Sequence, residues 1–94
     1  MNDLSLDFII HPGDTIKEIL EEIKINQSEL AIRTGFSAKH INEVINGKKD
    51  ISPSFAKSLE YALGTPASFW INLQGIYDRE ILKYKEQVEI EEKV

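Results

Sequence analysis

Residues 27–47 read Gln-Ser-Glu-Leu-Ala-Ile-Arg-Thr-Gly-Phe-Ser-Ala-Lys-His-Ile-Asn-Glu-Val-Ile-Asn-Gly. This stretch predicts two short helices joined by a tight turn that contains a glycine. Asn26 is placed to cap the first helix, with Glu29 at its third position, and Ser37 is placed to cap the second. Gly35 stands where the backbone must reverse, which favours a positive φ. Helix pairs of this kind place their second helix in the DNA major groove.

The apolar residues of this pair predict which faces are buried. Leu30 and Ala31 face inward from the first helix, and Ile41, Val44 and Ile45 form an apolar stripe along the second. The side chains left pointing outward near the start of the second helix are Ala38, Lys39 and Asn42. Because base edges are read by short or polar side chains, this end of the helix is the predicted DNA-reading surface.

Composition limits the classes of protein to consider. The chain has 94 residues, enough for one domain with a modest core, and no cysteine, which excludes disulfides and thiolate metal sites. It has no long apolar run and its start is acidic, so we expect no membrane span, no signal segment and a cytoplasmic protein. The two histidines lie far apart and no catalytic motif is present, so we expect no enzyme, no cofactor and no metal.

Charge is distributed unevenly along the chain. The formal net charge is −5, but residues 24–57 carry six Lys or Arg and three acidic residues. Residues 1–23 carry one Lys and six acidic residues. The only basic zone therefore coincides with the predicted helix pair, and the acidic ends are available to a basic protein partner.

The rest of the chain predicts three further helices. Asp14 or Thr15 is expected to cap a first helix that runs to about Ile23 and buries that residue. Ser52-Pro53 begins a helix that Gly64 ends, and Thr65-Pro66 repeats the start. The prediction is an all-α, five-helix bundle with an arm at residues 1–13, a domain at 14–80 and a helical extension at 81–94.

The fifth helix carries its apolar residues at nearly heptad spacing. We expect Phe69 and Trp70 to be core residues rather than a ligand platform, and Asn72 and Gln74 either to bridge helices or to lie in a dimer contact. The predicted dimer contact is formed by Tyr77, Ile81, Tyr84 and Val88. The alternative is a helix that lies back on its own domain, and for the last residues a frayed end, a strand or a partner-bound segment stays open.

Several motifs resemble one family, over roughly residues 11–80. His11-Pro12-Gly13-Asp14 resembles its opening, and Asn46-Gly47-Lys48 with Ile51-Ser52-Pro53 resembles its central signature. Gly64-Thr65-Pro66 and Phe69-Trp70-Ile71-Asn72-Leu73-Gln74 resemble its most specific block, with Ile71 where leucine is usual. The chain thus resembles the HigA-type antitoxins, a branch of the Xre group with the phage-repressor type of helix-turn-helix.

The resemblance implies two activities: repression of the chain's own operon through operator DNA, and neutralisation of a HigB-type toxin, a small basic RelE-like ribonuclease. The helix pair alone is also compatible with a stand-alone Xre regulator, and a third possibility is a protein-interaction module with a vestigial DNA face. By the resemblance, Gln27 lies near the DNA backbone and Ser37, Ala38, Lys39 and Asn42 face the bases. The remaining predicted DNA contacts are His40, Asn46, Lys48 and Lys49.

Overall fold

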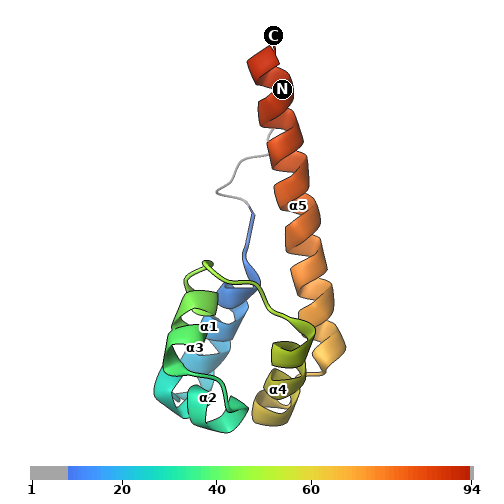
Figure 1. Cartoon of the computed structure of the whole chain (residues 1–94). Coiled ribbons are helices and arrows are strands. Elements are labelled where there is room, and N and C mark those ends of the chain that lie inside the picture. Colours follow the sequence, from blue (N-terminus) through green and yellow to red (C-terminus); the bar gives the residue numbers. More distant parts are fainter. Residues whose placement is uncertain (1–8, 94) are drawn as a thin grey trace.

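The computed structural model describes residues 9–93, and every regular element in that range is a helix. The five helices are α1 (Pro12–Ile23), α2 (Gln27–Thr34), α3 (Ala38–Ile45), α4 (Pro53–Leu63) and α5 (Ala67–Lys93). The predicted all-α bundle of five helices is confirmed. Figure 1 shows four short helices gathered at one end and α5 running out of this group.

Local capping explains why most helices begin where they do. The Oδ1 of Asn26 accepts from the Glu29 amide at 2.8 Å, and the Oγ of Ser37 accepts from the His40 amide at 3.0 Å. Ser52 caps α4 in the same way. At the end of α2, Gly35 has a φ of 78°, the left-handed conformation that glycine adopts at little cost. These predicted helix boundaries are therefore confirmed.

The start of α1 differs from the prediction. His11, rather than Asp14 or Thr15, is the N-cap, and its Nδ1 accepts from the Gly13 amide at 2.9 Å. Pro12 then occupies the first helical position, where its fixed φ and missing N–H suit a helix start. Residues 12 and 13 thus belong to α1 and not to the predicted arm, most of which lies outside the described residues.

One core joins all five helices. Its fully buried members are led by Trp70 and Phe55, and it also contains Ile16, Leu20, Leu30, Ile41, Val44, Ile45, Ile51, Ala56 and Leu59. Two expected core residues are not buried: Phe69 is 41% exposed and Ile23 is 45% exposed. Each lies in a terminal turn of its helix, where the neighbouring helices no longer cover every side.

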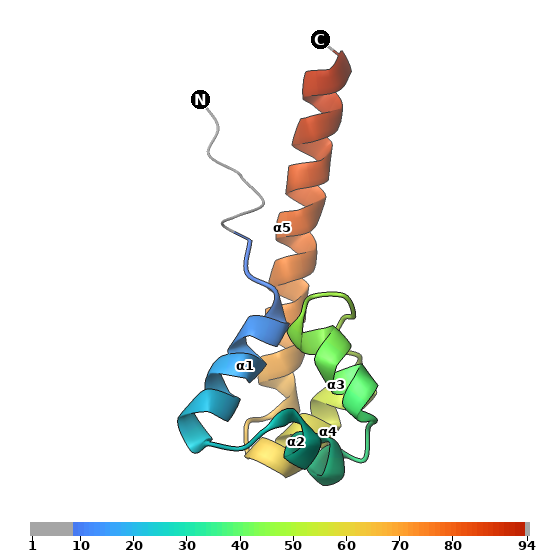
Figure 2. The same ribbon diagram turned by 90° about the vertical axis from the view of Figure 1, so that its left-hand side faces the viewer.

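Helix α5 is continuous, and only its first half packs on the bundle. The molecule measures 50 × 21 × 21 Å, and Figures 1 and 2 show the second half of α5 standing clear of the other helices. The question left open between helix and strand is thereby resolved in favour of a helix to Lys93. The alternative in which α5 lies back on its own domain describes its first half, and its second half projects from the bundle. Within residues 9–93, none of the helices has the length and apolarity that crossing a bilayer requires.

Candidate nucleic-acid interface

The turn between α2 and α3 is held rigidly, which fixes how α3 is presented. The hydroxyl of Thr34 donates to the Leu30 carbonyl at 2.8 Å and accepts from the Phe36 amide at 3.2 Å. Leu30 and Ile41 are both fully buried, so each helix is anchored to the core by its inner face. The outer face of α3 is consequently a defined surface on a rigid support (Figure 2).

Three amide side chains form a ladder on this outer face. Asn42 Nδ2 donates to Gln27 Oε1 at 3.2 Å, and Asn46 Nδ2 donates to Asn42 Oδ1 at 3.2 Å. An amide nitrogen carries two protons and an amide oxygen two lone pairs, so Asn42 keeps one of each for another partner. That remaining pair is the combination that recognises adenine N6 and N7 in the major groove. The structure therefore brings Gln27, Asn42 and Asn46 together on one face.

The first turn of α3 completes the reading surface. Ser37, Ala38 and Lys39 are all exposed there. The Ser37 hydroxyl already accepts from a backbone amide, so its proton is the part that can still be donated. Lys39 forms no ion pair within residues 9–93, which leaves its ammonium available to a guanine edge or a phosphate. Base contacts by these residues stay a prediction.

The two lysines of the α3–α4 loop differ in their surroundings. The Lys48 side chain is exposed, and its amide donates to the Glu43 carbonyl at 2.8 Å, which fixes the backbone. The Lys49 ammonium lies 3.4 Å from Glu43 Oε1 and is partly neutralised by it. Both phosphate contacts stay predictions, and the arrangement favours Lys48 as the stronger of the two.

His40 has a packing role that the sequence did not indicate. Its ring centroid lies 4.7 Å from that of Phe36 and 4.8 Å from that of Phe55, and its Nε2 is buried with no hydrogen-bond partner among residues 9–93. Burial, reinforced by the charge of Lys49 and opposed by Glu43, lowers the pKa of His40 below its usual 6.5. The ring is thus a neutral member of the aromatic cluster under α3, and its phosphate contact stays a prediction.

Gln74 supports the interface from α5. The residue is buried, its Oε1 accepts from the Ile51 amide at 2.8 Å, and its Nε2 donates to Asp78 at 3.0 Å. It therefore bridges α5 to the end of the α3–α4 loop, one of the two roles that the sequence left open. Asn72 is exposed and makes no such bridge. The sequence signal for this role was a glutamine on the buried side of an otherwise apolar helix.

The predicted dimer contacts continue the buried line of α5 beyond the bundle. Tyr77, Ile81, Tyr84 and Val88 are all half-buried. Tyr77 also packs within the chain, with its ring 4.7 Å from that of His11 at an interplanar angle of 75°. Their role between two copies stays a prediction.

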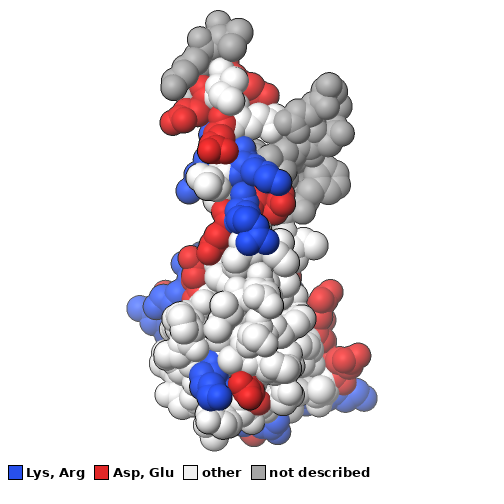
Figure 3. Space-filling view, turned by 90° about the vertical axis from the view of Figure 1, so that its right-hand side faces the viewer, with Lys and Arg blue, Asp and Glu red and all other residues white. Residues whose placement is uncertain are grey.

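One face of the bundle carries few charged side chains. Figure 3 views that side and shows the bundle nearly free of Lys, Arg, Asp and Glu, with charges at its edges and along the projecting part of α5. The acidic side chains of α1, namely Asp14, Glu18, Glu21 and Glu22, are exposed. These four carboxylates therefore lie on another helix than the predicted DNA-reading residues.

Comparisons with known proteins agree with this geometry. The helix-turn-helix family profile matches residues 16–70. Virulence-associated protein A' of Dichelobacter nodosus is 38% identical over 69 residues, which span 72% of this chain and 60% of that protein. The chain therefore covers less than two thirds of the length of this relative.

Two solved structures resemble the whole arrangement. A candidate antidote protein of a plasmid maintenance system from Nostoc punctiforme superposes with a TM-score of 0.85 at 37% identity, covering 88% of this chain and 91% of that one. The antitoxin HigA of Pseudomonas aeruginosa, solved with the higBA promoter, gives a TM-score of 0.81 at 31% identity, covering 92% and 95%. The similarity thus extends over most of both chains.

Proposed function

Because the chain belongs to the helix-turn-helix family, we propose that it is a HigA-type antitoxin that acts in the cytoplasm as a homodimer. It represses its own operon by binding operator DNA, and it neutralises a HigB-type ribonuclease. The observation that carries the DNA-binding part is the exposed amide ladder of Gln27, Asn42 and Asn46, flanked by Lys39 and Lys48. Its similarity to the promoter-bound antitoxin of Pseudomonas aeruginosa supports the same function.

In the proposed complex, α3 enters the major groove with its first turn leading. Asn42 reads adenine through its remaining proton and lone pair while the ladder holds its orientation, and Lys39 reaches a guanine edge. Gln27 and Lys48 contact the sugar–phosphate backbone, which sets the register and supplies most of the salt dependence. Dimerisation through Tyr77, Ile81, Tyr84 and Val88 would add a second half-site and so lengthen the sequence that is read.

The toxin is expected to bind a different surface. The exposed carboxylates of α1 lie on another helix than the DNA-reading residues, and the chain as a whole carries a net charge of −5. A basic ribonuclease would be steered toward such an acidic surface by long-range attraction. The protein could then hold DNA and toxin without the two competing for the same residues.

Fluorescence anisotropy with the promoter of the chain's own gene tests the DNA-binding part. We expect binding that is tighter to the promoter than to a random duplex of equal length, and that weakens as salt rises. Glu18→Gln is a matched control because it alters charge on α1 without touching the ladder. No binding at low salt would leave only a protein-interaction module.

Co-expression with the adjacent open reading frame tests the antitoxin part. We expect a short basic protein to copurify with the chain and growth arrest by that protein to be relieved. Promoter binding without copurification or rescue would instead identify a stand-alone Xre-type regulator.

A further inference from the structure

The α3–α4 loop, residues 46–52, carries Lys48 and Lys49, and its position decides whether they reach phosphate. We infer that His11 is the positioning residue for this loop, and that its imidazole ring sets the phosphate contacts of the proposed DNA complex. The inference rests on the proposed function for its DNA readout. His11 itself touches no DNA in this arrangement, because it is 93% buried, with 7% of its surface exposed.

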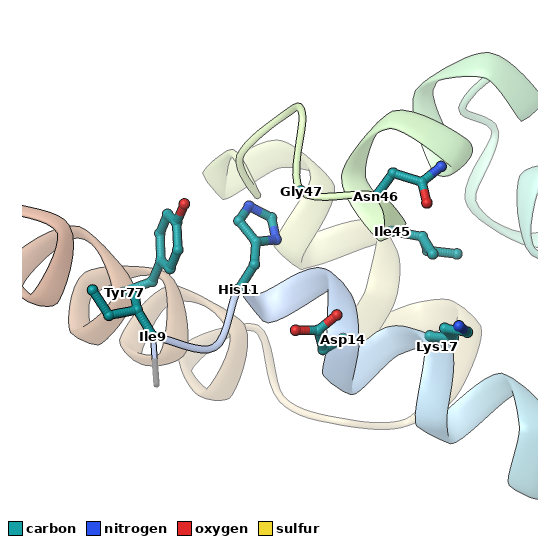
Figure 4. A pocket seen from close by; sticks show the side chains of 8 residues that line it. All are labelled: Ile9, His11, Asp14, Lys17, Ile45, Asn46, Gly47 and Tyr77. Atoms are coloured by element: carbon teal, nitrogen blue, oxygen red, sulfur yellow. The ribbon is translucent and has the colours of Figure 1, made fainter. Parts of the chain in front are cut away.

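Three segments distant in sequence converge on the His11 ring. Through Nδ1 it caps α1, as described above, and the Tyr77 ring of α5 stands edge-on to it. On the loop side, a Cβ added to Gly47 would lie 3.7 Å from His11 Cγ, an ordinary van der Waals distance, so the ring faces this glycine across the space of about one methyl group. Figure 4 shows the imidazole with Tyr77 on one side and Gly47 above it.

The ring also faces the charged end of the loop. His11 Nε2 lies 3.6 Å from Asp50 Oδ1, beyond ordinary hydrogen-bond distance but within reach of an electrostatic contact. Since Nδ1 accepts a hydrogen bond, the neutral ring carries its proton on Nε2, which is the atom that points to Asp50. The ring therefore meets the loop at two points, Gly47 and Asp50, on either side of the two lysines.

Among the residues that the structure describes, two outside the loop form hydrogen bonds to it through their side chains: Gln74 accepts from the Ile51 amide, and Asn42 accepts from the Asn46 side chain. Neither of these two side chains bonds residues 47–50, and the His11 ring lies beside this middle part of the loop, next to Gly47 and Asp50. Next to the ring lies a cavity of about 390 Å³ lined in part by Lys17, Asn46 and Tyr77. A smaller side chain at position 11 would enlarge this space, so the loop could shift into it and displace Lys48.

Two substitutions separate the ring from the cap. His11→Asn keeps an acceptor for the Gly13 amide, since asparagine is a preferred N-cap, but removes the ring against Gly47 and Tyr77. His11→Phe keeps a ring of similar size but has no acceptor for the cap. Both are made in the full chain, and DNA binding is measured against salt with the promoter and with a random duplex.

For His11→Asn we expect affinity for both duplexes to fall by the same factor, roughly fivefold near 0.15 M salt, with a salt slope shallower by about 1. His11→Phe should lower the urea midpoint of unfolding while its salt slope stays as in the wild type. A residue that acted only on stability would reduce the active fraction and leave the slope unchanged. An unchanged slope in His11→Asn therefore overturns the inference.

Amide hydrogen exchange gives a readout that needs no DNA. The Gly47 and Lys48 amides donate to the carbonyls of Val44 and Glu43 at 3.0 and 2.8 Å. In His11→Asn we expect these two amides to exchange at least about tenfold faster relative to the amides of α4, and in His11→Phe to keep the wild-type ratio. If the wild-type chain binds no promoter, the proposed function fails while this ratio still decides the role of His11. Equal ratios in all three proteins would overturn it.

Discussion

The bundle and the projecting half of α5 share the same helical spacing of apolar residues but differ in how far those residues are buried. In the bundle the pattern is covered by other helices, and Trp70 has no exposed surface. Past Glu80 the same line continues through Ile81, Tyr84 and Val88, which remain half-buried. An apolar stripe stabilises a fold only where a second element covers it and removes it from water. The bundle is therefore complete within one chain, whereas the projecting part suits a partner.

The largest expected difference between the two regions is in stability. Trp70→Ala should lower the free energy of unfolding by about 3–5 kcal/mol, because it removes a fully buried ring and leaves a cavity. Ile90→Ala, at a position that is 64% exposed, should change it by less than about 0.5 kcal/mol. Urea unfolding followed by circular dichroism measures both. Similar losses would mean that the projecting half is as well packed as the bundle.

Truncation separates the regions by assembly. A chain ending at Glu80 should no longer form the predicted dimer. Its urea midpoint should equal that of the full chain measured at high dilution, where the full chain is a monomer. Analytical ultracentrifugation compares the two chains. Full-length Tyr84→Lys, which places a charge in the predicted dimer contact, should lower the dimer content without shortening the chain. Unchanged sedimentation after truncation would refute a dimer contact beyond residue 80.

The DNA contacts of each subunit should come from the bundle, and from two kinds of residue there. Asn42→Ala should weaken promoter binding by about 1–3 kcal/mol and reduce the preference over a random duplex. Lys48→Ala should weaken both duplexes equally and make the salt slope shallower by about 0.9. Anisotropy titrations at several salt concentrations distinguish these patterns. If the two variants behave alike, Asn42 is not a base-reading residue. If either variant also changes the dimer content, DNA binding and dimerisation are not carried by separate regions.

The smallest expected effect is a pH dependence confined to the bundle. Burial lowers the pKa of His40 in the folded chain, while the unfolded chain takes up that proton near pH 6.5. Below this pH the unfolded state binds more protons than the folded state. His40 therefore leaves the free energy of unfolding unchanged above about pH 6.5 and lowers it increasingly as the pH falls beneath that value. Urea midpoints at about pH 7.5 and 5.5 should differ less in His40→Gln than in the wild type. An equal difference would assign the effect to other groups.

Local chemistry made much of the fold predictable. Asn26, Ser37 and Ser52 cap helices through bonds that span three residues, and such bonds do not depend on the rest of the molecule. The cap at His11 escaped prediction because histidine is an unusual N-cap and its place depends on Gly47 and Tyr77, which are remote in sequence. The same holds for His40, whose neighbour Phe55 comes from α4.

The candidate site was predictable as a set of residues but not as an arrangement. The sequence places Gln27, Asn42 and Asn46 on outer faces, yet a ladder across two helices requires the angle at which α2 and α3 meet. Phe69 and Trp70 show the same limit, because adjacent aromatic residues on a helix point about 100° apart and only the docking of α5 decides which one is buried.

The amino-acid order by itself determined five helices, the caps of α2, α3 and α4, the basic zone at the helix pair and an apolar line that extends beyond the bundle. Those features arise from contacts between near neighbours and from helical periodicity, which a linear pattern records. Tertiary structure alone decided that one imidazole lies between α1, the α3–α4 loop and α5, and that none of the other helices packs on the line past Glu80. Such relations depend on the packing of distant segments, whose free energies no single stretch of sequence contains.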